Sequence, residues 1–266
     1  MKHISSLAIA AAALSVATLA HAADIPGRRS APVPAPSYVA APPMFTWTGF
    51  YVGVNAGYGF SGKNKASYNG DAAYLAQGAN APRSYNLKHN GFFGGGTVGY
   101  NYQSGSFVGG VEADLNASGA SSKSSTVIAP NATGIAKSSL GAFGTLRGRV
   151  GFLATDRWLV YGTAGMMIGQ TKLSNSLAGT AAPMTAGATW SGTGDKTKVG
   201  LVAGVGTEYA LTNNVTAKLE YLYYDLGKSS LTAAPTNVAA TATGIRPALS
   251  QSNNGNLLRT GLNFKF

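Results

Sequence analysis

Apolar and polar residues alternate with a period of two along most of the chain, in runs of about 10 to 14 residues. In the first run, 47–60, Phe50, Val52 and Tyr58 share one face, whereas Asn55 and several glycines share the other. Such alternation indicates β-strands that have one apolar and one polar face. The pattern predicts eight strands, at 47–60, 90–103, 107–115, 138–152, 158–169, 197–210, 215–227 and 255–266.

The connections between these strands alternate in length. Short connections at 103–106, 154–157 and 211–214 take turns with long polar ones at about 61–89, 116–137, 170–196 and 228–254. Such long loops are unusual in a compact soluble domain, but an outer-membrane barrel has tight turns on the periplasmic side and long loops outside. Residues 45–266 are therefore predicted to be all-β, an eight-stranded antiparallel transmembrane β-barrel. A soluble β-sandwich or lipocalin-like barrel is the alternative.

The charged residues of the predicted strands lie on the face opposite the apolar one. A membrane barrel turns its apolar side chains to lipid and its polar ones to the lumen, whereas a soluble barrel keeps its apolar residues inside. Four acids and four bases are therefore assigned to the lumen, namely Glu112, Asp114, Arg147, Arg149, Glu208, Lys218, Glu220 and Arg259.

The registers of neighbouring strands bring opposite charges together. A hairpin centred on Asn213 places Glu208 opposite Lys218, and Glu220 is predicted to face Arg259. The third and fourth strands bring the two acids at 112 and 114 near the two arginines at 147 and 149. Because eight strands enclose a space that side chains can fill, these charges are predicted to form a network that plugs the lumen. Surface salt bridges on a soluble sheet are the alternative.

Aromatic residues gather where the strands are predicted to leave the membrane. Such residues form girdles at both interfaces of outer-membrane barrels. The outer girdle is predicted at Tyr58, Phe60, Phe92 and Tyr223, and the girdle at the short turns at Trp47, Phe50, Tyr100, Tyr102, Phe107, Phe152, Trp158, Tyr209 and Phe266.

Composition points to an anionic neighbour. Only 11% of the residues are charged, against about 25% in a typical soluble domain, yet the formal net charge is +11. Nucleic-acid binding is not expected, because the bases are not clustered with interleaved aromatics. Bases outnumber acids in the long connections, and we hypothesise that they contact the phosphates of lipopolysaccharide; solvated loop charge is the alternative. These bases are Lys63, Lys65, Arg83, Lys88, Lys123, Lys137, Lys172, Lys196, Lys228 and Arg246, and the acids are Asp71 and Asp195.

The N-terminal segment predicts export. Lys2 and His3 precede an apolar run that ends in Ala20-His21-Ala22, a small-x-small cleavage site. Residues 1–22 are therefore predicted to be a cleaved Sec signal peptide, with an uncleaved membrane anchor as the alternative. Residues 23–44 are rich in proline and are predicted to be an extended periplasmic tether. The expected location is the outer membrane of a Gram-negative cell.

Catalytic and cofactor chemistry finds little support in the sequence. The chain has no cysteine, so disulfides and thiolate ligands are excluded. Gly94 to Gly99 match G-x-G-x-x-G, but they lie inside a predicted strand with no helix after it. His89 is the single histidine left after signal cleavage, so two-histidine metal sites cannot form within one chain. No cofactor or metal is expected, and an outer-membrane enzyme that uses His89 as base is the least favoured hypothesis.

The chain ends in an alternating segment, "LLRTGLNFKF". Counted back from Phe266, Phe264 and Leu262 face lipid whereas Asn263 and Arg259 face the lumen, and this last strand is predicted to pair with the first. The segment resembles the C-terminal signal that barrel-assembly machinery reads. The two terminal phenylalanines are the expected assembly residues.

Several segments carry a resemblance to a known family: "FTWTGFYVGVNAGYGF", "GTVGYNYQ", "FVGGVEADL", "LRGRVGF", "KLEYLYYDLG" and "LNFKF". With the signal and the proline-rich tether, they resemble the alphaproteobacterial outer-membrane immunogenic, porin-like β-barrel family over essentially the whole mature chain. The resemblance implies a small, abundant, surface-exposed eight-stranded barrel. Some relatives are described as binding haem or host components, but no motif here carries such a site over, so a loop ligand is not assigned.

Together these features predict a non-enzymatic integral outer-membrane protein that stabilises the envelope and uses its loops for surface contact. The alternative function is a narrow porin that passes small solutes through a rearranged lumen.

Overall fold

The computed structural model of the chain describes residues 45–60, 64–68, 70–78, 84–87, 90–120, 125–181 and 185–266. All of them belong to one compact unit, Met44–Phe266. The predicted signal peptide (1–22) and tether (23–44) lie outside the described residues. Within the described part of the chain, no helix is long and apolar enough to span a membrane.

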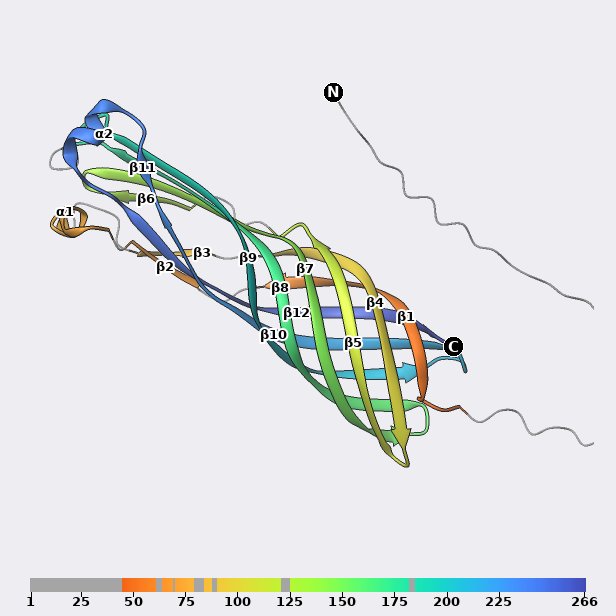
Figure 1. Cartoon of the computed structure of the whole chain (residues 1–266). Helices are drawn as coiled ribbons and strands as arrows, with labels where there is room; N and C mark the ends of the chain where they lie inside the picture. Colours follow the sequence, from red (N-terminus) through yellow and green to blue (C-terminus); the bar gives the residue numbers. More distant parts are fainter. Residues whose placement is uncertain are drawn as a thin grey trace, which may run out of the picture. The chain divides into compact units, whose positions relative to one another are not determined.

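Eight antiparallel strands form a closed ring (Figure 1). Each strand pairs with the next, and the last pairs with the first, so the ring has no free edge at this level. The predicted number of strands and the closure between first and last strand are therefore confirmed. The ring consists of β1 (Gly49–Phe60), β4 (Asn90–Ser104), β5 (Phe107–Ser118), β7 (Ala132–Thr155), β8 (Trp158–Gly179), β9 (Thr189–Ala210), β10 (Val215–Thr232) and β12 (Ala248–Lys265).

The strands are staggered around the ring. One row of paired residues, followed once around, starts at Trp158 of β8 and returns to the same strand at Ile168, ten positions further along. The row passes through Tyr209, Ala217, Leu262, Val54, Gly96, Leu115 and Gly144. A stagger of this kind requires the strands to tilt, and eight tilted strands leave an interior that side chains can fill.

The long connections differ from the prediction, because much of their length is strand. The structure adds β2 (Asn64–Tyr68), β3 (Ser84–Leu87), β6 (Ser125–Ala129) and β11 (Ala234–Pro235), with two short helices, α1 (Ala72–Leu75) and α2 (Val238–Thr243). β2 pairs with β12 and β3, β6 pairs with β7, and β11 pairs with β9. We call these elements and the adjoining ends of β7–β10 and β12 the extension.

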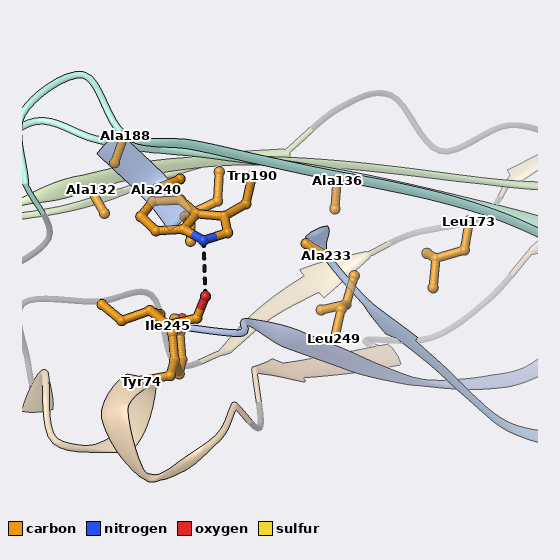
Figure 2. Close-up of a cluster of buried hydrophobic side chains, with 11 residues drawn as sticks. Tyr74, Ala132, Ala136, Leu173, Ala188, Trp190, Ala233, Ala240, Ile245 and Leu249 are labelled. Atoms are coloured by element: carbon orange, nitrogen blue, oxygen red, sulfur yellow. Dashed lines mark hydrogen bonds between the residues drawn. The ribbon is translucent and has the colours of Figure 1, made fainter. Parts of the chain in front are cut away.

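The extension has a hydrophobic core of its own (Figure 2). Leu173, Leu177 and Trp190 point inward from β8 and β9, and the indole nitrogen of Trp190 donates a hydrogen bond to the carbonyl oxygen of Ile245 at 3.0 Å. Because this core gives the long connections something to pack on, they form strands where the composition alone suggested polar loops.

Two irregularities mark where the ring passes into the extension. β7 shifts register between Leu140 and Phe143, and β10 shifts between Asp225 and Lys228, where Gly227 has a φ of +72°. A bulge reverses which residues face inward. In β7, even-numbered residues face the core of the extension, whereas odd-numbered ones such as Arg147 face the lumen.

The outer surface of the ring is apolar. Leu201 is 72% exposed, and Val150 and Leu115 are exposed to a similar extent. An exposed apolar surface that surrounds the whole ring is the reverse of a soluble barrel and suits contact with lipid. The soluble alternative is therefore wrong.

Candidate functional site

The eight predicted charges all lie inside the ring and are buried. Their positions follow from alternation: Glu112 and Asp114 are two residues apart on β5, as are the arginines on β7 and the charged pair on β10. We call them the lumen charge cluster, which comprises Glu112, Asp114, Arg147, Arg149, Glu208, Lys218, Glu220 and Arg259.

Glu112 lies at the centre of the cluster and is only 2% exposed. Its Oε1 accepts hydrogen bonds from Nη2 of Arg147 and, at 3.0 Å, from Nη2 of Arg259. Its Oε2 accepts from Nζ of Lys218 at 2.7 Å and from the hydroxyl of Tyr51 at 2.9 Å. A single carboxylate thus links four strands, β1, β7, β10 and β12, to β5.

Two further acids complete this centre. Oδ2 of Asp114 lies 3.0 Å from Nη2 of Arg147 and 3.0 Å from Nη1 of Arg259. Glu220 pairs with Nε of Arg259 at 2.5 Å and with Nη1 of Arg147 at 3.3 Å, and lies 3.8 Å from Nζ of Lys218. Each guanidinium therefore bridges three carboxylates, a charge-assisted arrangement that fixes the relative positions of the strands.

A second centre lies toward the short turns, around Glu208. Arg149 donates from Nη1 to Glu208 at 2.9 Å and from Nε to Asn101 at 2.8 Å. Thr216 and Asn263 both donate to the other oxygen of Glu208, at 2.5 and 2.8 Å. Arg149 also lies 3.7 Å from Glu112, so the two centres are joined.

Aromatic rings enclose the guanidinium of Arg149. It lies 5.0 Å from the ring centroid of Tyr51 and 5.0 Å from that of Tyr161, distances at which cation–π attraction operates. Gly206 makes room for this stack, because a Cβ there would lie 2.6 Å from Cζ of Tyr161.

The cluster also has uncharged partners, of which only Asn263 is predicted from the sequence to face the lumen. They are Tyr51, Asn101, Asn116, Thr145, Tyr161, Thr216 and Asn263. The signal that could have found them is parity, since each occupies one of the alternate positions of its strand that face inward.

The predicted registers are confirmed. Glu208 lies opposite Lys218, Glu220 opposite Arg259, and Glu112 opposite Arg147. Ion pairing follows the register only in part, because Glu208 pairs with Arg149 while Lys218 reaches across to β5. In so narrow a lumen, long side chains reach strands that are not adjacent.

Apolar layers lie on both sides of the charge cluster. Along β8, Leu159 belongs to an apolar cluster at the short turns, and Met167 belongs to an apolar cluster nearer the extension. The lumen charge cluster lies between these two apolar clusters. Trp47 fills the end at the short turns: it is 1% exposed, and its indole nitrogen donates to the carbonyl of Asp156 at 3.1 Å. The prediction that Trp47 belongs to the lipid-facing girdle is therefore wrong, since the segment before β1 turns into the lumen.

The terminal phenylalanines lie at the same end of the ring. Phe264 and Phe266 face outward, their ring centroids are 5.3 Å apart, and Phe266 is 72% exposed. The backbone nitrogen of Phe266 donates to the carbonyl of Phe50 at 3.0 Å, so the last residue takes part in closing the ring.

The loop charges divide into several groups. Lys63, Arg83, Lys88, Lys123 and His89 lie outside the described residues, and the structure describes no side chain for Lys65. Lys137, Lys172, Lys196 and Lys228 are exposed on the extension, where Lys172 lies 3.6 Å from Asp195. Asp71 accepts hydrogen bonds from the backbone nitrogens of Tyr74 and Arg246, so it orders the extension.

Two other sequence features can be placed. Gly94 to Gly99 lie within β4, where they pair with strands on both sides. Among the described residues, no group of three or more His, Cys, Asp or Glu side chains could hold a metal ion.

A closed ring of eight antiparallel strands, apolar outside and ionic inside, defines an outer-membrane β-barrel. The chain belongs to the outer membrane protein beta-barrel domain family, whose model matches residues 6–246. It is 37% identical to the 31 kDa outer-membrane immunogenic protein of Brucella melitensis, over 99% of this chain and 100% of that protein. It is 33% identical to the 22 kDa outer membrane protein of Rhizobium leguminosarum, over 69% of this chain and 66% of that protein.

Among solved structures, the outer membrane protein OprG of Pseudomonas aeruginosa matches 84% of this chain and 98% of its own, with 14% identity and a TM-score of 0.47. The resemblance to alphaproteobacterial outer-membrane immunogenic proteins is confirmed by the relatives from Brucella and Rhizobium. The protein is accordingly located in the outer membrane of a Gram-negative cell.

Proposed function

We propose that the protein is a non-enzymatic structural barrel that stabilises the cell envelope and presents its extension for contact at the cell surface. The proposal rests on the layers of buried side chains that fill the lumen. A solute would have to pass the layer around Trp47, the lumen charge cluster and the apolar layer around Phe143 and Leu222 in turn.

The charge cluster supports a stabilising role for physical reasons. Breaking a buried ion pair by removing one partner costs about 3–5 kcal/mol, because it leaves an uncompensated charge. Opening a path through this lumen would separate several such pairs at once, since Glu112, Asp114 and Glu220 share the same two arginines.

The orientation follows from the ends of the chain. Tyr51 near the start of β1 pairs with Lys265 at the end of β12. The chain therefore enters and leaves the barrel at the end that carries the short turns (Figure 1). We assign this end to the periplasm, as in other outer-membrane barrels, and the extension to the outside.

Lipopolysaccharide is the proposed partner of the extension. On β8 the outward side chains change from Met166 and Ile168 to Gln170 and Lys172, which places the edge of the lipid-facing band between them. Lys137, Lys172 and Lys228 lie beyond that edge. Their ammonium groups can form charge-assisted hydrogen bonds with the phosphates of the surrounding lipid.

The proposed partner at the periplasmic end is the barrel-assembly machinery. Phe264 and Phe266 present two outward-facing rings in edge-to-face contact at the end of the strand that closes the ring. Such a pair is available for recognition before β12 pairs with β1.

Conductance tests the sealed lumen against the narrow-porin alternative. The purified barrel in a planar lipid bilayer is expected to show no stable single-channel current, with a general diffusion porin as positive control. A reproducible conductance of the wild-type protein would replace the structural role with transport. An enzymatic role is tested by His89→Ala, which should change no property of the purified protein.

A further inference from the structure

A groove of about 340 Å³ runs along the outward face of the extension. It lies on β7, β8 and β9, on the side of these strands opposite the core shown in Figure 2. The side chains that form it are Ile135, Lys137, Ser174, Ser176, Ser191 and Thr193.

Strand register builds the groove. Lys137, Ser174 and Thr193 form one row across the three strands, and two positions further along Ile135, Ser176 and Ser191 form the next. Because the outward side chains of β8 and β9 here are only serines and a threonine, these two strands form a low floor beside Ile135 and Lys137 of β7.

The strands that carry the groove are held from behind. Leu173 and Leu177 alternate with the serines of β8 and pack into the core of the extension, as does Trp190 beside Ser191 (Figure 2). Both rows are therefore preorganised, and a ligand would not have to order them.

The outward-facing hydroxyls and the ammonium group of the groove have no partner among the described residues. Among the described residues, the hydroxyls of Ser174, Ser176, Ser191 and Thr193 have no hydrogen-bond partner, and Lys137 has no ion-pair partner. By contrast, Lys172 in the adjacent row pairs with Asp195. The groove therefore combines hydroxyls that both donate and accept with one uncompensated positive charge.

The groove lies well above the lipid-facing band. Ile168 is the last large outward apolar residue on β8, and Ser174 and Ser176 follow six and eight positions later. At about 3.3 Å per residue and a strand tilt near 45°, this is about 14–19 Å beyond the hydrocarbon edge. In lipopolysaccharide, that height is above the lipid phosphates and within the sugars of the core.

We propose that this groove binds an acidic sugar in the core oligosaccharide of lipopolysaccharide molecules that surround the barrel. The proposal rests on the lipopolysaccharide contact proposed above and assigns the part of the molecule that is recognised. Sugar hydroxyls match the serine and threonine hydroxyls, and Lys137 pairs with the phosphate or carboxylate of the sugar. None of the described residues that line the groove is aromatic, which does not suit flat ring ligands.

The test uses the full mature protein in detergent micelles and core oligosaccharide released from lipid A by mild acid, which hydrolyses the glycosidic bond between the two. The wild type is expected to bind the oligosaccharide, measured by titration calorimetry. Ser176→Phe, which fills the floor, should weaken binding at least about tenfold. Lys137→Gln should weaken it by about tenfold and remove most of its salt dependence.

Thr197→Phe is the matched control, because Thr197 is exposed on the same face of β9 but lies two rows below the groove. It should bind like the wild type, and heat-modifiable gel migration confirms that each variant is folded. Unchanged binding by Ser176→Phe would overturn the proposal, as would equal affinity for a neutral dextran.

A separate arm compares sources of the acidic sugar. Tighter binding of a soluble acidic polysaccharide such as heparin than of the core oligosaccharide would overturn the assignment to the surrounding membrane. The lipopolysaccharide contact proposed above can fail while the groove proposal holds. In that case, substitution of Lys172 and Lys228 would leave co-purification of intact lipopolysaccharide unchanged, and the groove would still bind the free oligosaccharide.

Discussion

At the scale of single residues, Glu112 has the greatest structural importance. It pairs with Arg147, Lys218 and Arg259 and accepts the hydroxyl of Tyr51. Because these partners come from four strands and Glu112 lies on a fifth, one carboxylate connects five of the eight strands of the ring.

Glu112→Gln tests that importance. The substitution keeps the shape of the side chain but leaves the buried bases in excess, so the free energy of unfolding should fall by about 3–5 kcal/mol. The measurement is the temperature or urea concentration at which the unheated folded band converts to the unfolded band on a gel.

Two further variants serve as controls for this prediction. Asp195→Asn removes a carboxylate that is 70% exposed and should change stability by about 0–1 kcal/mol. The double variant Glu112→Gln with Lys218→Met restores charge balance and should regain part of the loss. Equal stability of the wild type and the Glu112 variant would show that the cluster does not hold the strands together.

At the scale of elements, β12 closes the ring and also carries the proposed assembly residues. Phe266, directly after β12, hydrogen-bonds to Phe50 of β1 and packs edge-to-face against Phe264. An exposed aromatic residue can therefore end the chain without fraying, because its backbone is paired.

Deletion of Phe266 should reduce insertion into the outer membrane and leave secretion intact. The measurement is the amount of protein in the outer-membrane and periplasmic fractions, with Phe266→Tyr as the control that retains an aromatic ring. Normal insertion of the truncated chain would refute the role of this residue.

The extension is the second element with a testable property, since it has a core separate from the lumen. Trp190→Ala should leave a cavity and an unpaired carbonyl at Ile245, with a cost of about 3–5 kcal/mol. Intact cells should then show faster proteolysis of the extension, while the ring keeps its heat-modifiable migration. Val238→Ala, at a position 85% exposed on α2, is the matched control. Proteolysis at the wild-type rate would contradict an independent core.

At the scale of the whole molecule, the structure predicts which surfaces water can reach. The chain has no cysteine, so each introduced thiol reports on one site. Ser176→Cys on the extension should react with a membrane-impermeant thiol reagent on intact cells, and Thr212→Cys at a short turn only after the outer membrane is permeabilised.

The interior gives the third outcome of this labelling experiment. Thr97 is buried in the lumen beside Asn55, so Thr97→Cys should stay unreactive in both conditions and react only after unfolding. Labelling of the folded protein at this position would show that water enters the lumen. Reaction of the thiol at 212 on intact cells would instead reverse the proposed orientation.

The sequence by itself determined the number of strands in the ring and which charged residues face inward. These features depend on period-two alternation, which is a local property of the chain, and the even number of strands then allows the last strand to pair with the first. For this reason Glu208 opposite Lys218 and Glu220 opposite Arg259 could be predicted without coordinates.

Only the tertiary structure decided where the charges find their partners and what the long connections do. Lys218 pairs with Glu112 across the lumen because the ends of long side chains converge in a narrow interior, and no alternation encodes that distance. The extension escaped prediction because the bulge near Leu140 reverses the alternation of β7. Its core brings Trp190 of β9 together with Tyr74 and Leu249, which lie far from it in sequence.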